Sequence, residues 1–174
     1  MGEYHIINAQ ECLSNPYPGI SVVPDRCRIT IDRRLLVGET EISVLEPLST
    51  MLAELARNDS QFRARCELRL DDITRLDGAT ERIANFSPAW RVDERLPAVR
   101  NALAALADAG LPSELGTYSF CTNGSWSAGR AGILTLGYGP SEERMAHVPD
   151  EFIEIDQLLG ASKGYLAIID TLLR

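Results

Sequence analysis

The segment from Arg26 to Leu35 constrains the fold most strongly, because apolar and polar residues alternate along it. A period of two sends successive side chains to opposite faces of an extended chain. The pattern therefore predicts a β-strand with one face buried and the other in water. The apolar face holds Cys27, Ile29 and Ile31, and the polar face holds Arg26, Arg28, Thr30 and Asp32.

A helix is expected after this strand. Apolar residues between Val44 and Leu55 recur at helical spacing, and Thr40 is a candidate N-cap for a helix that continues to about Arg57. Pro47 lies late for a proline of the first turn, so a start nearer Ser43 is an alternative.

Two further strands are expected in the first part of the chain, at residues 4–13 and 62–76. Residues 77–93 are interpreted as a connection, with a domain boundary near Ser87 and Pro88. Three strands and one helix make a partial two-layer α+β unit, because such a sandwich usually has a fourth strand and a second helix. The beginning of this unit is therefore expected to be missing.

The remaining sequence predicts a small unit of strands and helices, so the fold class is α/β. A first helix rich in alanine and leucine is expected to end at Gly110, since glycine favours the position after a helix. A last, amphipathic helix is expected to cover the sheet. The expected elements are a helix over 96–109, strands over 118–121 and 133–138, a helical turn over 124–131, and a helix over 155–173.

Composition excludes some classes of partner. A net charge of −8 and a pI near 4.8 argue against nucleic acid, because little positive charge is available to neutralise phosphates. The N-terminus has no signal-peptide pattern, and no apolar run is long enough to span a bilayer. A cytoplasmic protein is expected, with free thiols at its four widely spaced cysteines, Cys12, Cys27, Cys66 and Cys121.

His147 is the first candidate site residue, because it follows the expected strand over 133–138. Loops after strands are where α/β proteins place ligands, and a neutral imidazole ligates zinc. Glu151 could orient the imidazole or cap the following turn. The alternative is a histidine hydrogen-bonded in a polar loop. His5, the only other histidine, is expected to be an ordinary surface or edge residue.

Two further candidates lie elsewhere. Asn123 and Gly124 form an Asn-Gly pair whose amide could face a ligand, although a tight turn into a helix explains the pair equally well. Arg34 ends the alternating strand, where a guanidinium could grip a carboxylate with two hydrogen bonds. The alternative is that Arg34 is only a solvated residue at the end of a strand.

These segments together resemble the C-terminal part of the co-catalytic zinc amidohydrolases and peptidases, which include aminoacylase, acetylornithine deacetylase and succinyl-diaminopimelate desuccinylase. The similarity is greatest to the branch of peptidases and selenium-metabolism hydrolases. It rests on the order of the run Gly19–Arg34, the run Thr122–Gly124, and Gly137–Pro140 followed by Ala146, His147 and Glu151.

The resemblance implies a function and a division of the chain. Residues 1–88 match part of a lid domain that mediates dimerisation, and residues 89–174 match the C-terminal βα portion of the catalytic domain. His147 matches a metal ligand, Arg34 matches an arginine that binds the substrate carboxylate, and Asn123 and Gly124 match a loop beside the substrate. In that family two metal ions, expected to be zinc, activate water to cleave amide or peptide bonds in small carboxylate-bearing substrates.

Several family residues have no counterpart in this sequence. The HxD metal motif and the Glu-Glu pair, which holds the general base, are absent, and Ser21 stands where many relatives have asparagine. The 174 residues alone are therefore expected to bind zinc weakly at most and to hydrolyse nothing. The alternative is a non-catalytic dimerisation or binding module derived from such an enzyme. An in-frame HxD and Glu-Glu pair upstream in the coding sequence would favour the enzyme.

A homodimer is expected, because a missing strand would leave an open sheet edge that invites pairing with another chain. The other expected partner is a small-molecule or peptide substrate, with neither nucleic acid nor membrane.

Overall fold

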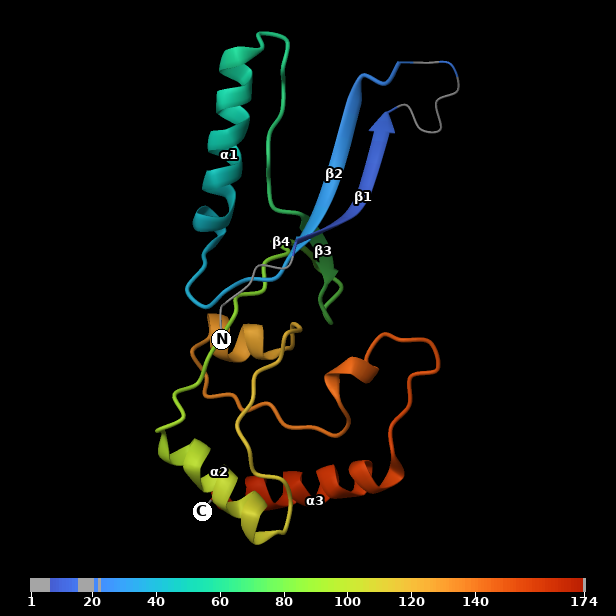
Figure 1. Ribbon diagram of the computed structural model, residues 1–174. Helices are drawn as coiled ribbons and strands as arrows, with labels where there is room; N and C mark the ends of the chain where they lie inside the picture. The colour runs from blue at the N-terminus through green and yellow to red at the C-terminus, as the bar shows by residue number, and fades with distance from the viewer. Residues whose placement is uncertain (1–6, 16–20, 22, 174) are drawn as a thin grey trace. The chain divides into compact units, whose positions relative to one another are not determined.

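The computed structural model describes residues 7–15, 21 and 23–173 of a mixed α/β chain (Figure 1). The chain divides into two compact units, Met1–Trp90 and Arg91–Arg174, and each is described by itself. This division falls close to the boundary that the sequence suggests near Ser87 and Pro88. The assignment of residues 1–88 to a lid domain and 89–174 to a catalytic domain stays a prediction.

Strands β1 (Ile7–Asn15) and β2 (Arg26–Arg33) form an antiparallel ladder of two strands. The strand predicted from Arg26 is confirmed, and the part of β1 expected at residues 4–6 lies outside the described residues. The register shifts between Ala9 and Glu11, which is a β-bulge. The bulge places Cys12 rather than Glu11 on the apolar face of the ladder, since one extra residue reverses the alternation.

The apolar face of this ladder is open, contrary to the expectation of a buried face. Ile29 is 60% exposed and Ile31 is 50% exposed. Both belong to a set of side chains that share one face because their positions are paired or alternate along the two strands. The set is Ile7, Ala9, Cys12, Cys27, Ile29 and Ile31, hereafter the ladder's apolar face.

Helix α1 (Glu41–Asn58) confirms the predicted N-cap, and the alternative start near Ser43 is wrong. The Thr40 hydroxyl accepts a hydrogen bond from the backbone N–H of Ser43, and the Ser43 hydroxyl accepts one from the N–H of Thr40. This reciprocal pair satisfies two donors that the first turn would otherwise leave open. It begins the helix at Glu41 even though Pro47 lies inside it.

The chain after α1 returns along the helix without joining a ladder (Figure 1). Cys66 makes this contact, with its sulfur 3.1 Å from Ser49 Oγ and 3.7 Å from the carbonyl oxygen of Leu45. The strand predicted over 62–76 is therefore only partly correct. Its paired portion is β3 (Leu70–Thr74) alone.

Strand β4 (Thr80–Ala84) pairs with β3 in a hairpin, so the interpretation of residues 77–93 as a connection is wrong for residues 80–84. The turn uses Gly78 at φ 83°, a conformation that glycine adopts without strain. The side chains of Arg82 and Asp72 face each other across the ladder at 2.8 Å. The Arg82 guanidinium lowers the pKa of Asp72 through this hydrogen bond and through its charge.

The second unit is built on helices α2 (Pro97–Asp108) and α3 (Ile155–Leu172), which confirms both predicted helices. Helix α2 ends as expected, with Gly110 at φ 70°. The two helices pack against each other (Figure 1), and the Lys163 ammonium donates to the carbonyl of Ala109 at 2.6 Å. Helix α3 therefore covers α2, and the expected sheet beneath it is not formed among the described residues.

The strands predicted over 118–121 and 133–138 are wrong, since neither segment has ladder hydrogen bonds within the described ranges. An extended segment becomes a strand only when a neighbour accepts and donates along it. The helical turn predicted over 124–131 is confirmed as the π-helix η1 (Ser125–Arg130). A short 3₁₀-helix, η2 (Glu143–Met145), precedes His147.

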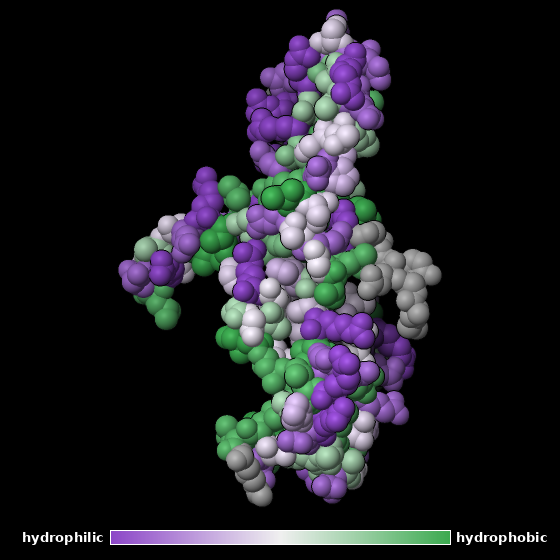
Figure 2. Space-filling model, turned by 90° about the vertical axis from the view of Figure 1, so that its left-hand side faces the viewer, coloured by the Kyte–Doolittle hydropathy of each residue, from purple (hydrophilic) through white to green (hydrophobic). Residues whose placement is uncertain are grey.

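Apolar burial is sparse among the described residues. The buried apolar side chains are Val44, Phe86, Val99, Ala102, Leu106 and Ala161. The accessible surface is 14007 Å², whereas two separate globular units of this size would expose about 10,000 Å². Figure 2 shows hydrophobic residues at the surface among hydrophilic ones. None of the helices in the part of the chain that the structure describes is long and apolar enough to cross a membrane.

Candidate functional site

The four predicted site residues fall in different units. Arg34 lies in the first unit, and Asn123, Gly124 and His147 lie in the second. Each group is therefore described within its own unit.

Arg34 follows the last residue of β2, at the start of the loop that leads to α1. Its guanidinium lies 3.6 Å from the carboxylate of Asp32, and its side chain is 44% exposed. An ion pair with this exposure stabilises the fold little, because water screens both charges. The guanidinium of Arg34 therefore has access to a carboxylate from solution.

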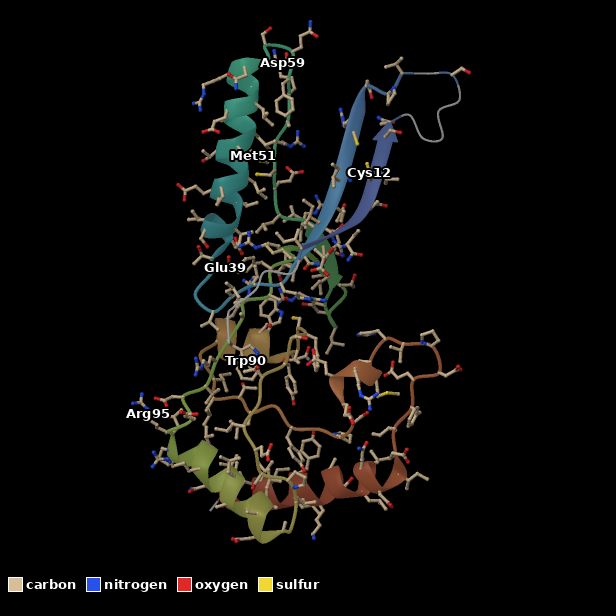
Figure 3. All side chains as sticks on the ribbon, in the orientation of Figure 1. Cys12, Glu39, Met51, Asp59, Trp90 and Arg95 are labelled. Atoms are coloured by element: carbon tan, nitrogen blue, oxygen red, sulfur yellow. The ribbon has the colours of Figure 1, made fainter. Side chains whose placement is uncertain are left out.

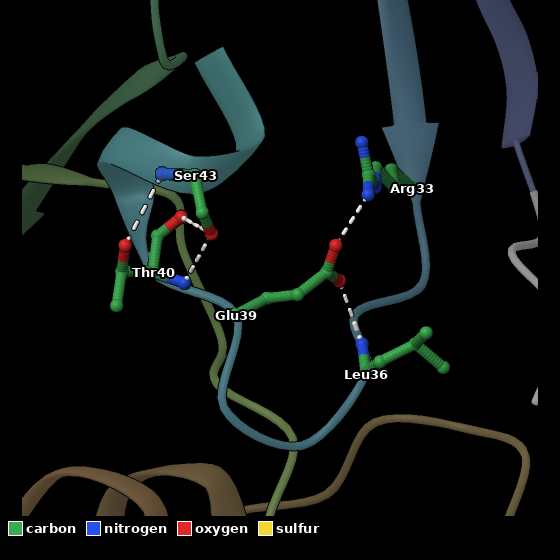
Figure 4. Close-up of polar contacts among 5 residues, drawn as sticks. All are labelled: Arg33, Leu36, Glu39, Thr40 and Ser43. Atoms are coloured by element: carbon green, nitrogen blue, oxygen red, sulfur yellow. Dashed lines mark hydrogen bonds and ion pairs between the residues drawn. The ribbon is translucent and has the colours of Figure 1, made fainter. Parts of the chain in front are cut away.

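Glu39 closes the loop that carries Arg34 (Figure 4). One carboxylate oxygen of Glu39 pairs with the Arg33 guanidinium, and the other accepts a hydrogen bond from the backbone N–H of Leu36 at 2.7 Å. The backbone N–H of Glu39 donates in turn to the carbonyl of Leu36 at 3.1 Å. The end of β2 and the cap of α1 are thus tied to each other on both sides of Arg34.

Asn123 and Gly124 lead into η1, as the turn alternative describes. The carbonyl of Asn123 accepts from the backbone N–H of Trp126 at 3.0 Å and of Ser127 at 3.3 Å. The N–H of Gly124 donates to the Thr122 hydroxyl at 3.1 Å. The backbone of this pair is committed to the turn, while Asn123 as a residue is exposed.

His147 lies in an exposed loop whose backbone is held in an unusual conformation. Ser141, His147 and Asp150 have φ of 71°, 62° and 59°, in the left-handed region that few residues other than glycine adopt. The Glu151 carboxylate accepts a hydrogen bond from the backbone N–H of His147 at 2.9 Å. Glu151 therefore fixes the backbone of the loop through this bond, which is neither of the two roles considered for it.

The loop of His147 is linked to the segment before Asn123. The Ser119 hydroxyl and its backbone N–H, the latter at 3.2 Å, both donate to the carboxylate of Glu143 in η2. These bonds tie the segment that precedes Asn123 by four residues to η2, which precedes His147. Arg144 lowers the pKa of the adjacent Glu142 through a hydrogen bond and its charge.

Aromatic rings and glycines hold the segment that leads to this loop. Gly137 lies against the ring of Tyr118, because a Cβ at Gly137 would meet Cζ of that ring at 3.1 Å. Tyr118 stacks on Phe120 with the ring centres 4.8 Å apart. Partial burial raises the pKa of Tyr118, and the nearby Tyr165 raises it further.

The ring of Tyr138 packs closely against helix α3 at Gly164. A Cβ added at Gly164 would lie 2.6 Å from two carbons of the Tyr138 ring, so only glycine allows this approach. The Tyr165 hydroxyl donates to the carbonyl of Tyr138, and the two rings meet edge to face at 5.3 Å. These contacts of Tyr138 fix the point from which the His147 loop begins.

The described residues do not fit a two-zinc site by themselves. No three histidine, cysteine, aspartate or glutamate side chains come together among them closely enough to hold a metal ion. Zinc needs at least three protein ligands even in an open catalytic site. A zinc centre would therefore need ligands from beyond the described residues.

Sequence reasoning missed two residues that shape the site, Glu39 and Gly164. Glu39 follows a glycine just before α1, and its sequence context indicated only that a helix begins there. Gly164 carried a usable signal, because a glycine inside a helix is destabilising unless close packing requires it. The partner that requires it, Tyr138, could not be identified from the sequence.

Comparison with known proteins relates the chain to longer ones. It is 30% identical over 154 residues to uncharacterized protein YgeY of Escherichia coli. The matched stretch is 87% of this chain and 36% of that protein. It is 29% identical over 87 residues to a protein of Pyrococcus horikoshii provisionally named LysW-lysine/LysW-ornithine hydrolase, covering 50% of the chain and 27% of that protein.

A protein of Thermococcus kodakarensis with the same provisional name is 29% identical over 90 residues, 52% of the chain and 26% of that protein. No protein-family model matches the chain. The chain spans about a third of the length of the curated relatives it matches. These similarities support a distant relation to hydrolases of the peptidase and amidohydrolase type.

The close packing of Tyr138 against Gly164 predicts that alanine has opposite effects on stability at two glycines of α3. Gly164→Ala is expected to destabilise the protein by about 1–3 kcal/mol, because the new methyl group overlaps the Tyr138 ring. Gly160→Ala is the matched control: its Cβ would meet only Leu111 Cδ2, at 3.7 Å, and alanine favours the helix by about 0.5–1 kcal/mol. Urea unfolding followed by circular dichroism measures the free energy of unfolding of both variants. Equal stability of the two would contradict the close packing of Tyr138 against Gly164.

Proposed function

We propose that this chain is part of a hydrolase that cleaves amide or peptide bonds in small substrates bearing a carboxylate. The similarity to proteins named hydrolases carries this proposal, together with the much greater length of the relatives. The remaining parts of the active site would then come from residues beyond these 174. The branch of peptidases and selenium-metabolism hydrolases is the proposed subgroup.

The proposed roles follow the positions of the four residues. Arg34 binds the substrate carboxylate, and its exposure supports that role. The contacts of the Glu39 carboxylate with Arg33 and Leu36, hereafter the Glu39 clamp, support it as well. Asn123 and Gly124 border the substrate. His147 supplies one ligand to a zinc ion that other residues complete. No general base is assigned in this chain, so the water-activating step lies outside it.

Zinc binding and hydrolysis by the purified chain test this proposal. We expect no hydrolysis of N-acetyl amino acids above the uncatalysed rate, because the described residues do not hold a metal centre. Zinc binding measured by calorimetry is expected to be weak and to fall about tenfold or more in His147→Asn. Asparagine tolerates the left-handed backbone, so the variant removes the imidazole without adding strain.

His147→Asn is compared with Asp150→Asn, which changes another left-handed position of the same loop. Hydrolysis by the chain alone would refute the assignment of the catalytic groups to other residues. Equal zinc affinity of both variants and the unmodified chain would refute the ligand role of His147.

The carboxylate role of Arg34 is tested with N-acetylglycine as the probe, titrated while chemical shifts are recorded by NMR. Arg34→Gln is expected to weaken binding about tenfold, since a charge-assisted hydrogen bond contributes about 1.5–3 kcal/mol. Arg28→Gln removes an exposed arginine from β2, the strand that Arg34 follows, and should leave binding unchanged. Equal losses in the two variants would show that the probe senses only net charge.

The alternative function is a non-catalytic dimerisation or binding module, and the open apolar face of the β1–β2 ladder favours it. Under either function we propose a homodimer, because the exposed edges of the two-stranded ladders invite pairing with another chain. Sedimentation equilibrium at micromolar concentration is expected to give twice the chain mass of 19.1 kDa. A monomer there would refute the dimer.

A further inference from the structure

Cys12 and Cys27 lie side by side on the β1–β2 ladder. Their sulfur atoms are 3.5 Å apart, within hydrogen-bonding distance for two thiols. Both cysteines are free and exposed, and Figure 3 shows Cys12 on β1. Two accessible thiols at this separation form a dithiol site rather than two independent cysteines.

The pairing of the strands creates this site. Cys12 lies opposite Ile29 and Cys27 lies opposite Ser14, so the two cysteines are diagonal neighbours on one face of the ladder. The bulge in β1 is what places Cys12 on that face, because it reverses the alternation along the strand. The contact is therefore built into the register of the two strands.

We propose that Cys12 and Cys27 are a reversible redox site, which a low-molecular-weight disulfide such as oxidised glutathione converts to an intramolecular disulfide. The Cys12 thiolate attacks one sulfur of the small disulfide, breaks its S–S bond and releases one thiol molecule. Cys27 then gives its proton to water and attacks the Cys12 sulfur, which releases the second thiol molecule. Two protein thiols are oxidised, and one small disulfide is reduced to two thiols.

The contact between the two thiols also bears on the order of attack. The hydrogen bond with Cys12 raises the pKa of the Cys27 thiol, so Cys27 holds its proton to a higher pH. Because the thiolate is the nucleophile, this shift favours Cys12 for the first attack, with Cys27 resolving the mixed disulfide. The second step is fast because Cys27 is already beside the sulfur that it attacks.

Closing the disulfide needs a small movement. The sulfur atoms must approach from 3.5 Å to about 2.05 Å. Since both residues are exposed, their side chains can rotate without displacing buried neighbours. Diagonal neighbours lie farther apart than directly opposite residues, and strained, exposed disulfides are the readily reduced ones.

The other two cysteines provide internal controls. Cys66 has Ser49 Oγ beside its sulfur at 3.1 Å, and Cys121 has Ser125 Oγ at 3.4 Å. Each therefore has a serine hydroxyl rather than a second sulfur as its side-chain neighbour. Neither is expected to form an intramolecular disulfide with the same reagent.

The test treats the full chain with defined mixtures of oxidised and reduced glutathione, followed by tryptic mass spectrometry. We expect a disulfide-linked peptide pair containing Cys12 and Cys27, which dithiothreitol reverses. Cys12→Ser and Cys27→Ser should each lose this pair to background and accumulate a glutathione adduct on the remaining cysteine. Cys121→Ser, an exposed control, should retain the linked pair in full.

A mixture of isotope-labelled and unlabelled chains separates bonds within a chain from bonds between chains. A linked pair that joins labelled to unlabelled peptides would overturn the proposal. Stable glutathione adducts on both cysteines of the unmodified protein, or no reaction at either, would overturn it as well. Circular dichroism confirms that each serine variant keeps the secondary structure of the unmodified chain.

Discussion

Every strand in this structure depends on a partner for its backbone hydrogen bonds. The β1–β2 and β3–β4 ladders exist because each strand finds its neighbour a few residues away in the sequence. The apolar segment 133–138 has no such neighbour among the described residues, and it remains extended without a ladder. It is held instead by a backbone hydrogen bond from Ile133 to Ser127 and by side-chain contacts, with Tyr138 against Gly164 and Tyr118 against Gly137. Local pairing thus decides which extended segments become strands.

The small number of paired strands also explains why much apolar surface stays exposed. Two-stranded ladders bury little by themselves, and three or more strands or a covering helix are usually needed for independent stability. The apolar face of the β1–β2 ladder has the alternation of a core strand but remains exposed. Such a face points to covering surfaces outside the described residues. The greater length of the matched relatives is consistent with that interpretation.

Sequence patterns predicted the helices and β2 well, because hydrophobic spacing and capping residues are local signals. Thr40 marked the start of α1, and Gly110 marked the end of α2. The hairpin of β4 was missed although Asp77 and Gly78 form a typical turn pair, since the strand after them is polar and lacks clear alternation. Contacts between distant segments, such as Tyr138 on Gly164, have no local signature. The positions of Arg34 and His147 suggested their roles, the resemblance implied the same roles, and both stay predictions.

The Glu39 clamp has a consequence for molecular recognition. A flexible loop must be ordered when a ligand binds, and the lost conformational entropy weakens affinity. In this chain the hydrogen bond from Leu36 and the ion pair with Arg33 order the backbone around Arg34 before any ligand arrives. The entropy loss is incurred during folding. If Arg34 binds a carboxylate as proposed, only its guanidinium side chain would then have to be ordered.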